Sequence, residues 1–156
     1  MARFSLHIWD AQKKKILVTA IKATQQDFEA TSVEPRWQTD WTSDYITFSG
    51  FDLYAFKMVV GELVALGAYE VRNGNMGVHI VYMESQAEST LTLVEIPKYR
   101  GIGRALIAYG IKLSVDAGFN GDVAPDTKTP ELAIHYEKDF GAVRCLEGTV
   151  ERHLDI

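Results

Sequence analysis

The sequence contains one cysteine and fewer basic than acidic residues, and each shortage excludes a class of protein. Cys145 is the single cysteine, so the chain cannot form an internal disulfide or a cysteine-rich metal site. Lys and Arg total 16 against 21 Asp and Glu, a formal net charge of −5 that argues against binding DNA or RNA through a basic face. We therefore expect a cytoplasmic protein with no nucleic-acid partner and no metal.

Long hydrophobic runs are also missing. The longest near-apolar stretch, residues 58–69, is interrupted by Gly61 and Glu62 and falls short of the roughly 20 residues that a membrane-spanning helix needs. Residues 1–10 contain no apolar stretch leading to a small-residue cleavage site, so they do not look like a signal peptide. We expect no membrane span.

The composition that remains is typical of a packed protein. The chain has 156 residues, of which 47% are hydrophobic and 24% charged. This length is close to that of one ordinary domain, and the hydrophobic content suffices for a core. No repeat, low-complexity tract or linker interrupts the chain. We therefore expect a single domain over residues 1–156.

Hydrophobic periodicity predicts a mixed α/β domain. Helices are expected over 12–28, from Ile102 to a stop at Gly118, and over 129–140. Strands are expected over 4–9, 53–60, 63–71, 78–83, 120–124, 142–145 and 149–153, with an Asn-Gly hairpin turn at 73–74. Residues 32–50 show no clean period and are expected to be irregular, with at most one short helix. The predicted fold class is α/β, with a mixed, mainly antiparallel central sheet flanked by helices.

A glycine-bearing loop at residues 97–103 leads into the predicted helix at Ile102. Gly101 and Gly103 lack side chains, so backbone amides at the positive end of the helix can approach an anion closely. The loop is not a Walker phosphate loop, which needs Gly-Lys followed by Ser or Thr. It is not a dinucleotide fingerprint either, because Leu106 occupies the place of the third glycine. An ordinary helix start with a tight turn remains the alternative.

Residues 98–103, which read Lys-Tyr-Arg-Gly-Ile-Gly, resemble the signature of the GNAT family of acyl-CoA-dependent N-acetyltransferases. That signature is Gln or Arg, two residues, Gly, one residue, and Gly or Ala, so Lys98 departs from it. Residues 116–123 and 130–142 are similar to the family's following strand and helix. The resemblance implies that the loop binds the pyrophosphate of acetyl-CoA. The binding residues so implied are Lys98, Tyr99, Arg100, Gly101, Ile102, Gly103, Arg104 and Ala105.

The resemblance also implies two catalytic residues. Tyr136 matches the family tyrosine that gives a proton to the departing thiolate, although its apolar helix face equally suits a core residue. Glu84, at the end of the strand predicted over 78–83, matches the family's strand-end carboxylate and is the expected base. If the central strand runs over 90–96 instead, Glu95 replaces Glu84. An ordinary solvent-facing acid is the alternative for either residue.

The resemblance implies a GNAT-like fold and an N-acetyltransferase that transfers an acetyl group from acetyl-CoA to a primary amine of a small molecule or a protein. Four aromatic residues of the irregular segment are candidates for the acceptor pocket or for a lid packed on the core: Trp37, Trp41, Tyr45 and Phe51. The alternative function is a non-catalytic acyl-CoA-binding or partner-binding protein. A homodimer is compatible with the expected exposed strand edges.

Overall fold

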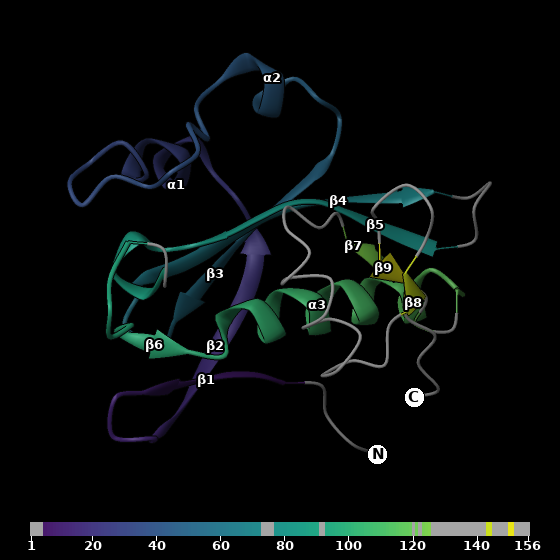
Figure 1. Cartoon of the computed structure of the whole chain (residues 1–156). Helices are drawn as coiled ribbons and strands as arrows, with labels where there is room; N and C mark the ends of the chain where they lie inside the picture. Colours follow the sequence, from purple (N-terminus) through teal and green to yellow (C-terminus); the bar gives the residue numbers. More distant parts are fainter. Residues whose placement is uncertain are drawn as a thin grey trace. The chain divides into compact units, whose positions relative to one another are not determined.

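The structure is a computed structural model that describes residues 5–72, 77–90, 93–119, 121, 123–125, 143–144 and 150–151. Figure 1 shows its elements in the order of the chain. The strands are β1 (Leu6–Asp10), β2 (Lys15–Lys22), β3 (Asp52–Met58), β4 (Leu63–Arg72), β5 (Gly77–Ser85), β6 (Tyr99–Arg100), β7 (Val123–Pro125), β8 (Val143–Arg144) and β9 (Val150–Glu151). The helices are α1 (Gln25–Ala30), α2 (Asp44–Thr47), the 3-10 turn η2 (Ala87–Ser89) and α3 (Ile102–Asp116).

Seven strands form one sheet in the order β6-β1-β2-β3-β4-β5-β7, and β8 and β9 form a separate pair. Strand β1 pairs antiparallel with both β2 and β6, and β2 pairs antiparallel with β3. Strand β7 pairs parallel with β5. The sheet is therefore mixed and mainly antiparallel, which confirms the predicted fold class.

The chain divides into two compact units. The first comprises Met1–Ala68 and Met83–Leu106, and the second comprises Tyr69–Tyr82 and Ile107–Ile156. The prediction of one domain over 1–156 stays a prediction. The core of the first unit includes Ile8, Trp41 and Phe56, each at most 1% exposed.

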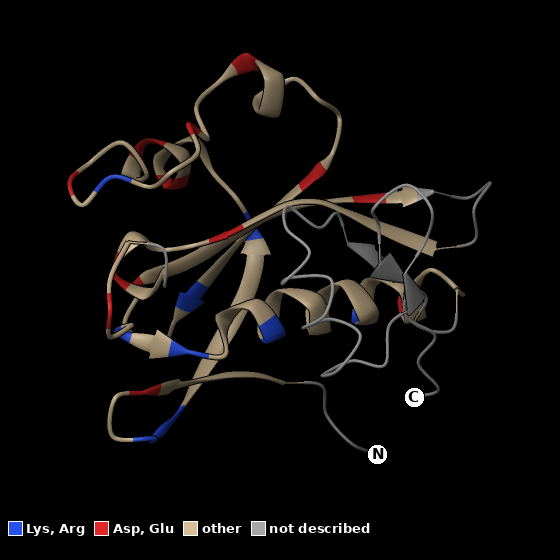
Figure 2. Ribbon diagram, viewed as in Figure 1, with Lys and Arg blue, Asp and Glu red and all other residues tan. Residues whose placement is uncertain are grey.

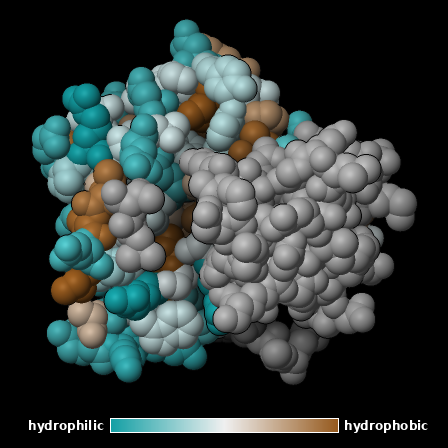
Figure 3. Space-filling view, viewed as in Figure 1, coloured by the Kyte–Doolittle hydropathy of each residue, from teal (hydrophilic) through white to brown (hydrophobic). Residues whose placement is uncertain are grey.

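In the second unit, the rings of Tyr69 and Tyr109 meet edge to face, with their centroids 5.7 Å apart. A Cβ added at Gly110 would lie 2.9 Å from Cδ1 of Ile80, so α3 approaches β5 closely at this glycine. On the face shown in Figure 3, the hydrophobic residues among those described stand in small separate spots between hydrophilic ones.

The predicted helix over 12–28 is wrong. Lys15–Lys22 is strand β2, paired with β1 through Leu6 and Val18 and with β3 through Val18 and Met58. Ile16, Leu17, Ala20 and Ile21 fit a helical period locally, but pairing with two neighbouring strands satisfies the backbone of this segment. Only Gln25–Ala30 is helical, after an N-cap at Thr24.

The remaining predicted elements mostly agree with the structure. Strands β3, β4 and β5 lie at the predicted positions, and residues 32–50 are irregular apart from α2. Helix α3 begins at Ile102 and ends before Gly118, whose φ is +87°. The predicted helix over 129–140 and the turn at 73–74 lie outside the described residues. In the ranges described, no helix is both long and apolar enough to cross a membrane.

Candidate functional site

The turn before α3 requires glycine at position 101. Gly101 has a φ of +86°, a backbone conformation that residues other than glycine rarely adopt. A Cβ on Gly101 would lie only 2.6 Å and 2.7 Å from two ring carbons of Trp9. Trp9 is brought there because β1 pairs with β6, with Trp9 opposite Arg100. The indole of Trp9 thus forms one side of the turn, a contact that the sequence did not reveal.

The start of α3 has the geometry of an anion site. The amide of Ala105 donates to the carbonyl of Gly101 at 3.0 Å, so the hydrogen bonding of the helix begins at Gly101. The amides of residues 102–104 lie in the first turn, where no intrahelical acceptor exists and the helix dipole is positive. The side chain of Ile102 is buried, so its contribution to binding would come from its backbone. Gly103 is exposed, and nothing lies within 4 Å of a Cβ built on it.

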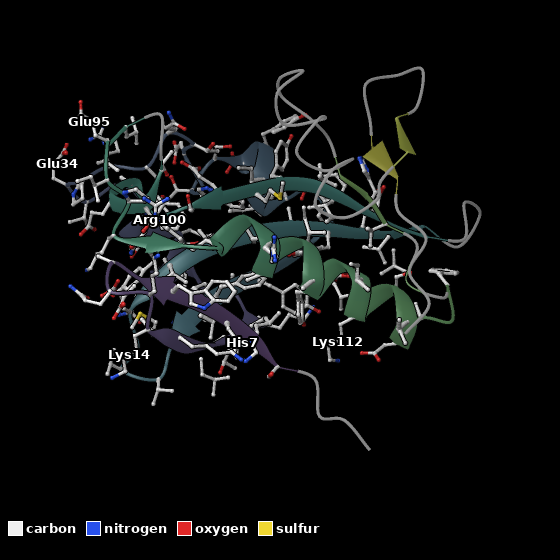
Figure 4. All side chains as sticks on the ribbon, turned by 60° about the horizontal axis from the view of Figure 1, so that its bottom comes forward. His7, Lys14, Glu34, Glu95, Arg100 and Lys112 are labelled. Atoms are coloured by element: carbon white, nitrogen blue, oxygen red, sulfur yellow. The ribbon has the colours of Figure 1, made fainter. Side chains whose placement is uncertain are left out.

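The arginines of the loop remain available to solvent. Arg100 and Arg104 are exposed, and Figure 4 shows Arg100 on β6, just before the chain enters α3. Two guanidinium groups beside a helix N-terminus add positive charge suited to phosphate oxygens. The geometry fits the pyrophosphate of a coenzyme, and the binding roles of residues 98–105 stay predictions.

Lys98 has acidic partners that the sequence did not suggest. Its Nζ lies 3.3 Å from Oε1 of Glu62 and 3.7 Å from Oε2 of Glu88. Partial burial works against the charged form, but the hydrogen bond to Glu62 and the nearby negative charges outweigh it and raise the pKa of Lys98. In this structure the ammonium group of Lys98 therefore forms ion pairs with Glu62 and Glu88. The two partners lie 36 and 10 residues from Lys98, so no local motif reports them.

Tyr99 is held from both its side chain and its backbone. Its side chain is 9% exposed, and its amide donates to Oγ of Ser89 at 3.1 Å. Burial raises the pKa of Tyr99, and the Glu62 carboxylate raises it further. The phenol is therefore neutral at physiological pH, and the Ser89 bond fixes the entrance to the glycine turn.

Glu84 lies at the end of β5, as predicted, but it is not solvent-facing. Glu84 is 8% exposed, and its carboxylate accepts three hydrogen bonds from residues 38–41. The donors are the Gln38 amide at 2.6 Å, the Thr39 amide at 3.2 Å and the Trp41 indole Nε1 at 2.9 Å. The expected role of Glu84 as a base stays a prediction. In the structure its carboxylate holds the irregular segment against β5.

The alternative base, Glu95, depends on a strand over 90–96, and that strand prediction is wrong. Ala87–Ser89 forms η2, and none of residues 90 and 93–96, the described part of this range, belongs to a strand. The amides of Leu93 and Val94 instead donate to the carbonyl of Thr90. Glu95 is exposed, and its side chain points outward in Figure 4. The structural basis for choosing Glu95 over Glu84 is therefore absent.

The other predicted site residues have mixed outcomes. Tyr136 lies outside the described residues, so its catalytic role stays a prediction. Trp37 and Trp41 are 8% and 1% exposed and belong to the core, whereas Tyr45 is 74% exposed. A role of these aromatic residues in an acceptor pocket stays a prediction. In the part of the chain that is described, no group of three or more His, Cys, Asp or Glu residues could hold a metal ion.

Comparisons with known proteins identify the fold. No protein-family model matches the sequence, and no curated protein matches it. A GNAT-family acetyltransferase from Listeria monocytogenes superimposes with a TM-score of 0.56 at 9% identity, covering 93% of this chain and 96% of that one. One from Staphylococcus aureus gives 0.54 at 12% identity, covering 88% and 99%.

A third solved structure, described as histone acetyltransferase HPA2 and related acetyltransferase, comes from Corynebacterium glutamicum. It superimposes with a TM-score of 0.53 at 11% identity, covering 89% of this chain and 97% of its own. All three chains match over nearly their full length. The chain therefore has the fold that the glycine loop suggested.

Proposed function

We propose that this chain, which has the fold of the GNAT acetyltransferases, transfers an acetyl group from acetyl-CoA to a primary amine. The observation that carries the proposal is the glycine turn at the start of α3. Gly101, with a φ of +86°, opens a helix of 15 residues directly after β6. Three solved structures of GNAT acetyltransferases share the fold of this chain, which supports acetyl-CoA as the proposed substrate.

The reaction needs two substrates in contact and two proton transfers. The neutral amine nitrogen attacks the thioester carbonyl, a C–N bond forms, and the C–S bond breaks to release the thiolate of coenzyme A. The nitrogen loses a proton and the thiolate gains one. Holding both substrates in the reactive geometry can lower the barrier by about 7 to 11 kcal/mol, and positioned acid and base groups add less.

In this scheme the amides of residues 102–104, with Arg100 and Arg104, bind the pyrophosphate. Tyr136 is the proposed donor of the thiolate proton, because a phenol with a pKa near 10 can give a proton without being ionised at neutral pH. Replacing Tyr136 with Phe is expected to lower kcat by about tenfold or more and leave acetyl-CoA affinity unchanged. A Tyr136→Phe protein with full turnover would remove Tyr136 from the mechanism.

The charge distribution favours a cationic amine as the acceptor. The segment of residues 23–53 carries six acidic residues and a single basic residue, Arg36. The formal net charge of this segment is therefore −5, which equals that of the whole chain. Figure 2 shows this acidic excess along the loops that carry α1 and α2. A region with this negative potential attracts an ammonium-bearing acceptor and concentrates it near the protein.

The test has two steps. Calorimetric titration with acetyl-CoA should give saturable binding, and release of the free thiol should then be followed with a panel of polyamines, aminoglycosides, amino acids and lysine peptides. We expect turnover with at least one multiply charged amine and little with neutral amines of similar size. Absence of binding to any acyl-CoA would overturn the proposal.

A non-catalytic acyl-CoA-binding protein is the second candidate, and one observation favours it. The carboxylate of Glu84, the expected base, is buried and accepts three hydrogen bonds from the protein itself, so protein donors already occupy its oxygens. Such a protein would bind acetyl-CoA and release no thiol with any acceptor. The same two measurements therefore separate the two functions.

A further inference from the structure

One short stretch of chain, residues 84–89, is hydrogen-bonded to two segments that are distant from it in sequence. At one end, the Glu84 carboxylate accepts hydrogen bonds from the backbone amides of Gln38 and Thr39 and from the indole N–H of Trp41. We call residues 38–41 the clasped segment. At the other end, Ser89 accepts the amide of Tyr99, two residues before the glycine turn. The whole arrangement lies within the first compact unit.

The stretch is itself fixed by buried hydrogen bonds. Ser89 donates its hydroxyl to Oε1 of Gln86 at 2.8 Å, and Gln86 donates through Nε2 to the Leu63 carbonyl at 3.2 Å. The Gln86 amide also donates to the Val64 carbonyl at 2.8 Å. Gln86 is 4% exposed and Ser89 8% exposed, so the bond between their side chains is shielded from competing water. Residues 84–89 thus form a rigid brace between the clasped segment and the glycine turn.

The clasp is built for a carboxylate. Three donors converge on the two oxygens of Glu84, and hydrogen bonds to a charged group are stronger than those to a neutral one. An amide at this position would present an NH₂ group to one of these N–H donors. Residues 38–41 belong to no helix or strand, so the Glu84 bonds act together with the turn bonds at Asp40 and the burial of Trp41 to hold this segment.

We propose that Glu84 is a positioning residue, which holds the clasped segment as one wall of the acceptor site while Ser89 holds the glycine turn for acetyl-CoA. The inference rests on the proposed function and deepens it. The brace sets the distance between the two substrates, since one rigid stretch anchors a segment from each side. Asp40 within the clasped segment and Asp44 just after it give this part of the chain a negative charge that suits a cationic amine.

The test uses the full chain and the variant Glu84→Gln. We expect the NMR signal of the Trp41 indole N–H to shift and its hydrogen exchange to accelerate about tenfold or more, since its charged acceptor is lost. The KM for the amine should rise about tenfold, with the dissociation constant of acetyl-CoA unchanged within about twofold. The dependence of kcat on pH should keep both its acidic and its basic limb, because a positioning residue does not itself transfer the proton.

Two matched variants sharpen the result. Ser89→Ala removes the acceptor of the Tyr99 amide and should produce the opposite pattern, with acetyl-CoA affinity reduced about tenfold and the amine KM unchanged. Glu95→Gln removes the same charge at an exposed position and should leave the Trp41 signal in place. If Glu84→Gln fails to fold, Trp41→Phe removes one donor, keeps an aromatic ring and should raise the amine KM in the same direction.

Each outcome decides the inference. An unchanged Trp41 signal and amine KM in Glu84→Gln would overturn it. Loss of one limb of the kcat profile with KM unchanged would also overturn it, because that is the signature of a base. If the unaltered chain binds no acetyl-CoA, the proposed function fails separately, and with it the positioning role. The exchange rate of the Trp41 indole would then still show whether Glu84 clasps the segment.

Discussion

Gly101 is the residue on which the coenzyme site depends most directly. Its φ of +86° and the 2.6 Å approach of Trp9 to a Cβ built at this position both exclude larger residues. We expect Gly101→Ala to reduce the free energy of unfolding by about 2 kcal/mol, because a left-handed conformation alone costs an L-residue about 1 to 2 kcal/mol. Acetyl-CoA affinity should fall about tenfold or more, which calorimetry measures directly.

Gly103→Ala is the matched control for this change. A Cβ on Gly103 has no neighbour within 4 Å, and Ala has the higher helix propensity. The variant should be as stable as the unaltered protein or slightly more stable, as denaturant titration would show. Equal losses of stability in both variants would contradict the idea that the positive φ and the Trp9 contact are what exclude a side chain at Gly101.

At the scale of single elements, α1 is held by Asp27 through its capping box and an ion pair. The Asp27 side chain accepts the amide of Thr24 at 2.9 Å and pairs with Nζ of Lys57 at 2.7 Å, while the residue is 5% exposed. Burial alone would raise the pKa of Asp27, but the bonds from Lys57 and Thr24 outweigh it and lower the pKa overall.

Asp27→Asn should therefore reduce the free energy of unfolding by about 2 to 3 kcal/mol at neutral pH, through loss of a buried pair and a cap. Because the folded-state pKa lies below the unfolded value of about 3.9, the stabilisation is complete above that value and is lost as pH falls through the folded pKa. Denaturant titrations at several pH values should show the difference between the two proteins closing in acid.

The exposed pair of Lys112 and Asp116 offers the comparison. Its atoms lie 2.6 Å apart, but the side chains are 36% and 58% exposed. Asp116→Asn should change stability by no more than about 0.5 kcal/mol. A comparable loss in both variants would show that burial of Asp27 is not what matters.

Packing of α3 on β5 gives a second prediction at this scale. A Cβ on Gly110 would lie 2.9 Å from Cδ1 of Ile80 and 3.3 Å from Cε1 of Tyr69, and both side chains are at most 1% exposed. Overpacking costs about 1 to 3 kcal/mol, which exceeds the gain of about 1 kcal/mol in helix propensity. Thermal unfolding should therefore show Gly110→Ala to be less stable, whereas Gly103→Ala in the same helix is not.

For the whole molecule, the prediction concerns charge. If the acidic segment 23–53 attracts a cationic amine, the KM for that amine should rise several-fold between about 20 and 200 mM salt, because screening weakens long-range attraction. A neutral amine should show no such dependence. Steady-state kinetics with both acceptors tests this, and equal salt responses would argue against electrostatic attraction of the acceptor.

The sequence by itself determined the features that depend on neighbouring residues. The glycine turn, the start of α3 at Ile102 and the strands β3 to β5 follow from backbone preference and local hydrophobic pattern, and the structure agrees. Residues 15–22 have a pattern that suits either a helix or a strand, so pairing with β1 and β3 had to decide it.

Only the tertiary structure decided what the charged side chains do. Glu84 meets donors 43 to 46 residues away, and Lys98 meets Glu62 across 36 residues. A sequence motif shows that a carboxylate stands at a strand end, but whether that carboxylate is free to take a proton depends on which donors the fold brings to it. Here the fold brings three, and they make Glu84 an anchor for the loop that contains Trp41.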